Sequence, residues 1–270
     1  MPTQVLFYSN AQPVNQTRHK DLCVKTGPDF SFAKDTNSVP LMAVEFPHAA
    51  SEYAIMFAGS EEKPIPVVIM GYNESENRYI DEDEQWRAKY IPAFIRRYPF
   101  VFSSSDDGDT LTLCVDEEYD GCNEDGHGER LFDADGERTL FLNNTLKFLE
   151  EYQAHYYRTE NFCKTLKELD LLEPVTARFT TPDGQQRNLT GIQSVSRKKM
   201  KELSEADLHK LHQSDGLELI YLHLHSSRNL QNMLEMGSAE GTKDTEAAAK
   251  PKRKSSRSKA KKSQDEQASP

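Results

Sequence analysis

The chain has 270 residues, 36% hydrophobic residues and a mean hydropathy of −0.75, which predict a soluble folded protein with one large domain or two small ones. The net charge of −11 is unevenly distributed: residues 237–270 carry nine Lys and Arg against five Asp and Glu, and the rest carries 24 against 39. Because a body with a charge of −15 repels phosphates, its composition excludes nucleic-acid binding by the body as a whole.

The cysteines and the apolar runs indicate a compartment. Four cysteines form no Cys-x-x-Cys pair, which favours free thiols and a reducing environment. No Lys or Arg precedes Arg18 and the first apolar run is short, so no secretory signal is expected. No apolar run approaches the roughly 18–20 residues that cross a bilayer. We therefore expect a cytoplasmic protein without a transmembrane segment.

Short apolar or alternating runs predict that the N-terminal half consists mainly of antiparallel strands. The compact runs 53–57 and 66–70, separated by a turn with Gly and Pro, are typical of buried strands. Residues 78–81 are predicted to return as a hairpin strand after the polar turn 71–77. The other predicted strands are 5–8, 21–25 and 39–46, with a helical turn at 48–51.

Residues 86–102 contain the only tryptophan, two prolines and a series of aromatic side chains. Pro92 suits the first turn of a helix, and Pro99 is expected to end that helix near Tyr98. Burial of each large apolar side chain contributes roughly 1.5–3 kcal/mol, so this segment is a predicted core anchor. A strand at 100–102 is expected to form a hairpin with 110–115 through the Asp- and Gly-containing turn 104–108.

The second half begins with an acidic, Gly-rich loop at 116–136 and then an apolar stripe at three-and-four spacing over 139–170. This stripe predicts a long amphipathic helix, broken at most once. Runs 175–179 and 187–192 flank Thr181-Pro-Asp-Gly184 and predict a second hairpin. Ser204 is expected to cap a short helix with Leu208 and Leu211 facing inward. Residues 217–234 favour a helix, although 219–224 also alternates like a strand.

These elements predict an α+β body at 1–236 with a mainly antiparallel β N-terminal half, a long amphipathic helix and a smaller α/β C-terminal part. The body could divide into subdomains at about 1–137 and 138–236. Residues 237–270 have no large apolar side chain and predict a disordered, Lys-rich tail. Its segment 250–262 could contact nucleic acid or an anionic surface, or could act only as a solubilising extension.

Two groups of residues, one of histidines and one in the acidic loop, are candidate metal sites. His209, His212, His223 and His225 match no zinc spacing, and a helix would point His223 and His225 about 200° apart. In the acidic loop, positions 116, 118, 120 and 121 match the start of a calcium-binding loop, but its last position is His127 instead of Glu. A second acidic turn at 131–142 has Leu at both ends. Histidines on partly polar faces and solvated turn residues are the favoured interpretations, so no metal is expected.

Motifs for catalysis and cofactors give no assignment. The sequence has no Gly-x-Ser-x-Gly elbow and no glycine-rich phosphate-binding run, and none of the cysteines lies in a recognisable catalytic context. Catalytic residues are therefore left unassigned, and no cofactor is expected.

The candidate ligand-binding residues belong to the aromatic segment 86–102. Two adjacent guanidinium groups beside aromatic rings could bind a carboxylate or phosphate in a bidentate manner. In an acidic body, salt bridges of Arg96 and Arg97 to Asp or Glu are the favoured alternative. The candidate residues are Trp86, Arg87, Tyr90, Arg96, Arg97 and Tyr98.

The same segment and several later motifs resemble the SapC family, a bacterial family named after a gene linked to surface-layer loci. The resemblance spans about residues 1–235 and leaves out the basic tail. The matching motifs are Val39-Pro-Leu, Trp86-Arg-x-x-Tyr-Ile-Pro-Ala-Phe-Ile-Arg-Arg-Tyr-Pro-Phe100, Leu111-x-Leu-Cys-Val-Asp116, Leu131-Phe-Asp-x-x-Gly136, Phe148-Leu-x-Glu-Tyr-Gln153, Leu169-Asp-Leu-Leu-Glu-Pro174, Leu189-Thr-Gly191, His223-Leu and Asn229-Leu.

The resemblance implies no particular activity, cofactor or catalytic residue. Members are often encoded beside tryptophan-halogenase-like flavoproteins and outer-membrane receptors, which implies an accessory role with a protein partner. The leading hypothesis is thus a non-enzymatic cytoplasmic accessory or binding protein. The alternatives are an enzyme acting on a peptide or small molecule near Arg96 and Arg97, and a surface-layer or cell-surface component.

Overall fold

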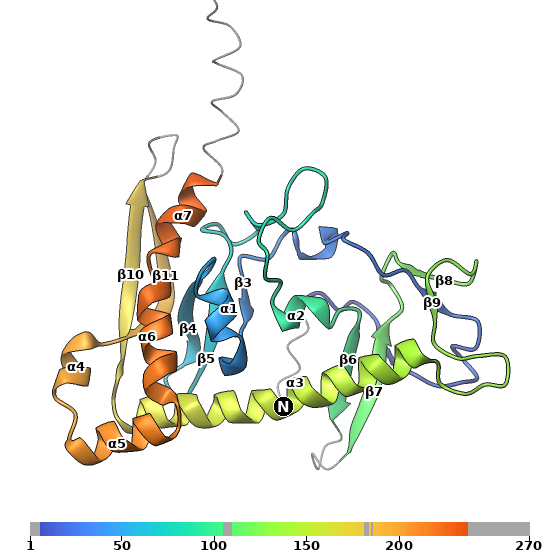
Figure 1. The fold of residues 1–270 in the computed structure, drawn as a ribbon. Coiled ribbons are helices and arrows are strands. Elements are labelled where there is room, and N and C mark those ends of the chain that lie inside the picture. The colour runs from blue at the N-terminus through green and yellow to red at the C-terminus, as the bar shows by residue number, and fades with distance from the viewer. Residues whose placement is uncertain (1–5, 105–109, 181–183, 185, 237–270) are drawn as a thin grey trace, which may run out of the picture.

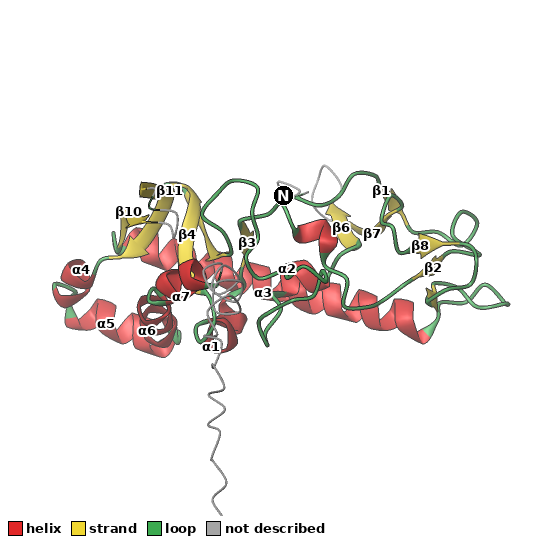
Figure 2. Ribbon diagram, turned by 90° about the horizontal axis from the view of Figure 1, so that it is seen from above, coloured by secondary structure: helices red, strands yellow, loops and turns green. Residues whose placement is uncertain are grey.

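Within residues 6–104, 110–180, 184 and 186–236, which the computed structural model describes, three antiparallel sheets lie along one 29-residue helix. This helix, α3 (Leu140–Glu168), runs along both halves of an elongated molecule (Figure 1). Seen from above, the helices lie mainly along one side and the strands along the other (Figure 2). The fold is therefore α+β, as the sequence predicted.

The largest sheet has the strand order β10-β11-β4-β5-β3. Its hairpin β4–β5 corresponds to the two compact apolar runs and is confirmed, as is the hairpin β10–β11. Strand β11 also pairs with β4, so an element of the second half joins a sheet of the first. The division of the body near residue 137 stays a prediction. The strands are β3 (Ser38–Pro40), β4 (Ala54–Ser60), β5 (Lys63–Ile69), β10 (Leu172–Thr180) and β11 (Gln186–Val195).

Two small sheets form the other half. One has the order β1-β7-β6, and its β6–β7 hairpin was predicted, although residues 105–109 of the turn lie outside the described residues. The second, β8-β2-β9, organises the acidic loop, where only a loop was expected. These strands are β1 (Ala11–Pro13), β2 (Cys23–Val24), β6 (Phe100–Ser104), β7 (Leu111–Asp116), β8 (Cys122–Asn123) and β9 (Glu129–Arg130).

Helix α3 is continuous and contributes to both hydrophobic cores. The Thr139 side chain caps it by accepting a hydrogen bond from the backbone N–H of Leu142. Leu142 and Leu149 are buried with the two small sheets, whereas Phe162 and Leu166 are buried with the large sheet. Because one helix supplies side chains to both cores, it links the two halves. It is also too polar to span a membrane: no described helix is long and apolar enough to do so.

The C-terminal helices differ in part from the prediction. The expected helix at 217–234 is two helices, because buried Asn229 donates hydrogen bonds to the carbonyls of Ala50 and Tyr53 and fixes the junction. Ser204 caps α5 as predicted, and Leu211 is buried, but Leu208 is 44% exposed and does not face inward. The helices are α4 (Arg197–Lys201), α5 (Glu205–Gln213), α6 (Gly216–Ser226) and α7 (Asn229–Glu235).

Three predicted strands need correction. Strand 39–46 ends at Pro40 and continues as a 3-10 turn (Ala43–Glu45) and α1 (Phe46–Ala49). Residues 78–81 make only an isolated bridge between Ile80 and Trp86, because the backbone N–H groups of Arg78 and Asp81 bond the carbonyls of Met70 and Gln85 instead of one neighbouring strand. In 5–8, the described residues 6–8 form no strand. The remaining short elements are a 3-10 turn (Ser31–Ala33) and α2 (Ala93–Arg96).

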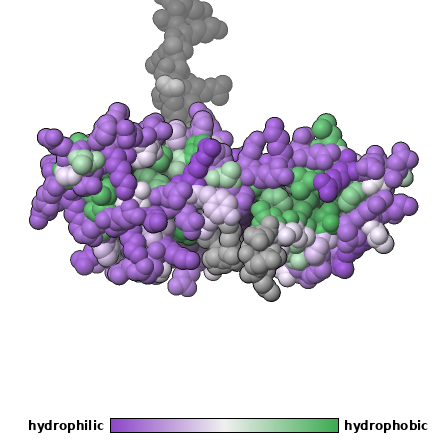
Figure 3. Space-filling view, turned by 90° about the horizontal axis from the view of Figure 1, so that it is seen from below, coloured by the Kyte–Doolittle hydropathy of each residue, from purple (hydrophilic) through white to green (hydrophobic). Residues whose placement is uncertain are grey.

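On one face of the molecule, exposed hydrophobic side chains gather on one half (Figure 3). The face in Figure 3 is mostly hydrophilic, with hydrophobic side chains gathered on the half that contains β6 and β7. Leu111 and Leu140, from this half, are 39% and 76% exposed. All four cysteines are free thiols, as predicted, and the predicted disorder of 237–270 concerns residues outside the described part.

His223 is fully buried and joins three elements of the large half. Its Nδ1–H donates to the Ile55 carbonyl of β4 at 2.7 Å, and its Nε2 accepts the Val195 N–H of β11 at 3.1 Å. The pKa of His223 is lowered to about 4, mainly by burial. The hydrogen bond to the Ile55 carbonyl raises this pKa, and the nearby Arg197 charge lowers it. The expectation of a partly polar helix face is therefore wrong for His223 and holds for exposed His225.

We predict that the protein loses stability as the pH falls from about 6.5 to about 4. In this range the unfolded state binds a proton at His223 that the folded state excludes, which costs roughly 3 kcal/mol at pH 4. Urea unfolding at pH 7 and pH 4.5 measures this loss. His225→Gln should keep the full loss and His223→Gln should reduce it; equal pH dependence in both variants would contradict the assignment.

Candidate functional site

The segment that leads into α2 is held by a buried carboxylate. Glu45 is 3% exposed and accepts hydrogen bonds from the Met42 N–H at 2.8 Å, the Ala93 N–H at 2.7 Å and the Tyr90 hydroxyl at 2.6 Å. Charge-assisted hydrogen bonds of this kind are about twice as strong as neutral ones. Glu45 therefore fixes the start of α2 against the turn that follows β3.

Glu52 and Tyr53 hold residues 86–90, which precede α2 in the chain. The Glu52 carboxylate accepts the N–H groups of Lys89 and Tyr90, each at 2.9 Å. The Trp86 indole N–H donates to the Tyr53 hydroxyl at 2.6 Å, and this hydroxyl donates to the Tyr90 carbonyl. Trp86 and Tyr90 are thus structural supports, and the core-anchor prediction for this segment agrees with these contacts.

Three of the six candidate residues lie together at a cavity of about 390 Å³. Arg96, Arg97 and Tyr98 line it at the end of α2. Trp86, Arg87 and Tyr90 are not among its lining residues, and Arg87 is exposed. The lining also includes six aromatic residues from other parts of the chain: Phe30, Phe32, Phe100, Tyr119, Phe141 and Phe148.

Arg96 is an exposed cation of this cavity. Its Nε donates to the Ile91 carbonyl at 3.0 Å, and its guanidinium carbon lies 5.2 Å from the centre of the Phe148 ring. The described residues give Arg96 no salt bridge, so for this residue the expected ion pair is replaced by a carbonyl and aromatic rings. Aromatic support orients a guanidinium without neutralising its charge.

Arg97 and Tyr98 are more enclosed. The Arg97 guanidinium carbon lies 4.0 Å from the Phe94 ring centre and 5.1 Å from that of Tyr152. Tyr98 stacks on Phe32 at 4.4 Å, and its hydroxyl donates to the buried Asp116 carboxylate at 3.3 Å. Burial, reinforced by the Asp116 charge, raises the pKa of Tyr98 well above its usual value. The phenol therefore stays protonated at physiological pH.

The lining defines what the cavity can do. Arg96 and Lys25 are exposed cations at its edge, and Asp29 is an exposed carboxylate whose pKa is lowered by hydrogen bonds from Ser31. Aromatic faces bind flat or apolar groups, and a guanidinium binds a carboxylate or phosphate. The cavity therefore suits a ligand in which an anionic group adjoins an apolar or aromatic one.

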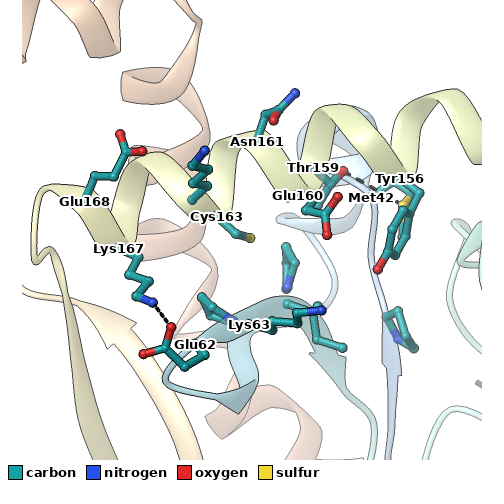
Figure 4. Close-up of a pocket in the computed structure, with 15 residues that line it drawn as sticks. Met42, Glu62, Lys63, Tyr156, Thr159, Glu160, Asn161, Cys163, Lys167 and Glu168 are labelled. Atoms are coloured by element: carbon teal, nitrogen blue, oxygen red, sulfur yellow. Dashed lines mark hydrogen bonds and ion pairs between the residues drawn. The ribbon is translucent and has the colours of Figure 1, made fainter. Parts of the chain in front are cut away.

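A second cavity, of about 540 Å³, lies between α3 and the β4–β5 hairpin (Figure 4). Its apolar lining includes Met42, Ile65 and Cys163, and its edge carries charged side chains from both elements. Burial raises the pKa of the Cys163 thiol to about 12, so this thiol is a weak nucleophile. Sequence reasoning missed this cavity, because its lining residues are separated by about a hundred positions.

Metal ligands do not cluster in the described part of the chain. No group of three or more His, Cys, Asp or Glu side chains there could hold an ion. Asp116, a candidate from the acidic loop, is instead buried and accepts the N–H groups of Ser9 and Asn10, each at 2.9 Å. Its role in the described structure is to anchor the chain before β1.

The fold is α+β, and the first cavity is lined by cationic and aromatic side chains. Among known proteins, the SapC family model matches residues 14–233. The chain belongs to the SapC family. No curated protein and no solved structure matches it significantly.

We predict that Glu45→Ala destabilises the protein by about 3 kcal/mol or more. The substitution leaves three donors without their acceptor, and each buried unsatisfied donor costs about 1–3 kcal/mol. Urea unfolding monitored by tryptophan fluorescence measures the change. Exposed Glu150→Ala, on α3, is the control and should change stability by less than about 0.5 kcal/mol. A loss at Glu45 as small as at Glu150 would refute this role.

Proposed function

We propose that this protein is a non-enzymatic cytoplasmic binding protein that acts with a partner protein. In this proposal the Arg96 cavity receives an acidic group of the partner next to an aromatic or apolar side chain. The observation that supports it is the exposed Arg96 guanidinium, oriented by the Ile91 carbonyl and the Phe148 ring at the edge of an aromatic-lined cavity.

An oriented Arg beside aromatic rings is typical of residues that contribute strongly to protein interfaces. Arg, Tyr and Trp dominate the few interface residues that carry most binding free energy, especially where aromatic walls exclude water. The Arg96 side chain is already oriented, so less conformational entropy is lost on binding. A carboxylate of the partner that binds in this cavity would be shielded from water by the aromatic walls and would meet an Arg96 side chain that is already oriented. Because genes of the SapC family are often found beside genes for tryptophan-halogenase-like flavoproteins, such a flavoprotein is our proposed partner.

The second candidate function is an enzyme acting on a peptide or small molecule in the same cavity. The observation that favours it is the convergence of Arg96, Arg97 and Tyr98 on one cavity. The raised pKa of Tyr98 suits a hydrogen-bond donor better than a general base. Recognition without chemistry is therefore the better-supported proposal. A surface-layer role rests on the family name alone.

We predict that Arg96→Glu weakens binding to the proposed partner, a tryptophan-halogenase-like flavoprotein, at least tenfold. Charge reversal replaces attraction to an acidic group with repulsion, and tenfold corresponds to about 1.4 kcal/mol. Isothermal titration calorimetry of the two purified proteins gives the dissociation constants. Lys89→Glu is the matched control, because Lys89 is an exposed cation of the same segment outside the cavity lining.

The control variant should bind like the unchanged protein. Equal affinity of the Arg96→Glu and unchanged proteins would contradict the proposed site. Absence of any binding between the unchanged protein and the flavoprotein would contradict the proposed partner. Turnover of a peptide or small molecule that is lost in Arg96→Glu would favour the enzyme.

A further inference from the structure

The second cavity is independent of the Arg96 site and has its own chemistry. It lies beside the C-terminal half of α3, which forms one wall, whereas the β4–β5 hairpin forms the opposite wall (Figure 4). Its volume of about 540 Å³ is within the usual range for small-molecule sites, about 300–1,000 Å³. The apolar part of the lining consists of Pro40, Met42, Pro64, Ile65, Pro66 and Cys163.

Three of the six charged side chains in the lining already have ion-pair partners. Lys167 forms an ion pair with Glu62 across the cavity, and Glu168 forms one with Lys210 of α5 at 3.1 Å. These pairs join α3 to the hairpin and to α5, and they cancel one another's charge. They therefore hold the walls of the cavity together, and the charges left for a ligand are those of the three other charged lining residues.

Three charges of the lining have no ion pair among the described residues: Lys63, Glu160 and Lys164. Two of them, of opposite sign, face the cavity from opposite walls (Figure 4). Glu160 points from α3 into the space, and Lys63 extends along the opposite wall (Figure 4). Among the described residues, neither forms an ion pair with the other or with a third residue. The Glu160 charge also contributes to the raised pKa of both Tyr156 and Cys163, after burial, which places this carboxylate close to the apolar lining.

We infer that this cavity binds a zwitterion with an apolar body, the chemistry of a free apolar α-amino acid. Its carboxylate would pair with Lys63, its ammonium group with Glu160, and its side chain would contact the apolar lining. An anion or a cation alone would pair with only one of these two charges. The inference goes beyond the proposed function and does not depend on it.

The test uses ligands that differ by one charge. Phenylalanine and leucine are zwitterions, N-acetyl-phenylalanine is only an anion, phenylalaninamide is only a cation, and glycine lacks the apolar body. Isothermal titration calorimetry with the full-length protein should show phenylalanine or leucine binding at least tenfold more tightly than the other three. Absence of phenylalanine and leucine binding at millimolar concentration would overturn the inference.

Single-charge variants then assign each wall. Glu160→Gln should weaken phenylalanine binding and leave N-acetyl-phenylalanine unchanged, whereas Lys63→Gln should weaken phenylalanine and leave phenylalaninamide unchanged. Glu150→Gln and Lys89→Gln, exposed charges outside the cavity, are the matched controls. Unchanged thermal unfolding shows that the variants are folded. Phenylalanine binding that is equal in all four variants would place the ligand elsewhere and overturn the inference.

Discussion

The Glu45 carboxylate is the interaction on which the candidate site depends. It is buried and binds one N–H from its own turn, one N–H at the start of α2 and one hydroxyl from Tyr90. A buried carboxylate is tolerated only where donors surround it, so the three groups must stay together in the folded state. The direction of α2, and with it the position of Arg96, follows from this constraint.

Helix α3 connects this site with the rest of the molecule. Phe148, near its middle, lies beneath the Arg96 guanidinium, and Glu160 faces the second cavity. Twelve residues of α-helix separate them by about 18 Å. The same helix is buried in both cores, so each cavity has one wall in a well-packed element. Rigid walls of this kind favour binding sites, because less order has to be gained when a ligand enters.

Local sequence patterns predicted the elements that depend on local physics. The apolar runs of β4 and β5 and the stripe of α3 each determine structure within a few positions. Glu45 was missed because one acidic residue in an apolar run looks like the outer face of a strand. The salt-bridge expectation for Arg96 was wrong because Phe148, its aromatic partner, is 52 positions away and no local pattern connects them. The single helix predicted at 217–234 is two helices, because Asn229 donates hydrogen bonds to the carbonyls of Ala50 and Tyr53, which lie far away in the sequence.

Hydrogen exchange of the backbone amides tests the central claim most directly, namely that the carboxylates of Glu45 and Glu52 make the segment before α2 part of the core. The account predicts that the amides of Tyr90 and Ala93 exchange only through the same large opening that exposes β4 and β5. Their free energies of opening should equal those of Ile55 and Val68, which are fully buried. Exchange of Tyr90 and Ala93 as fast as that of exposed loop amides would contradict the account.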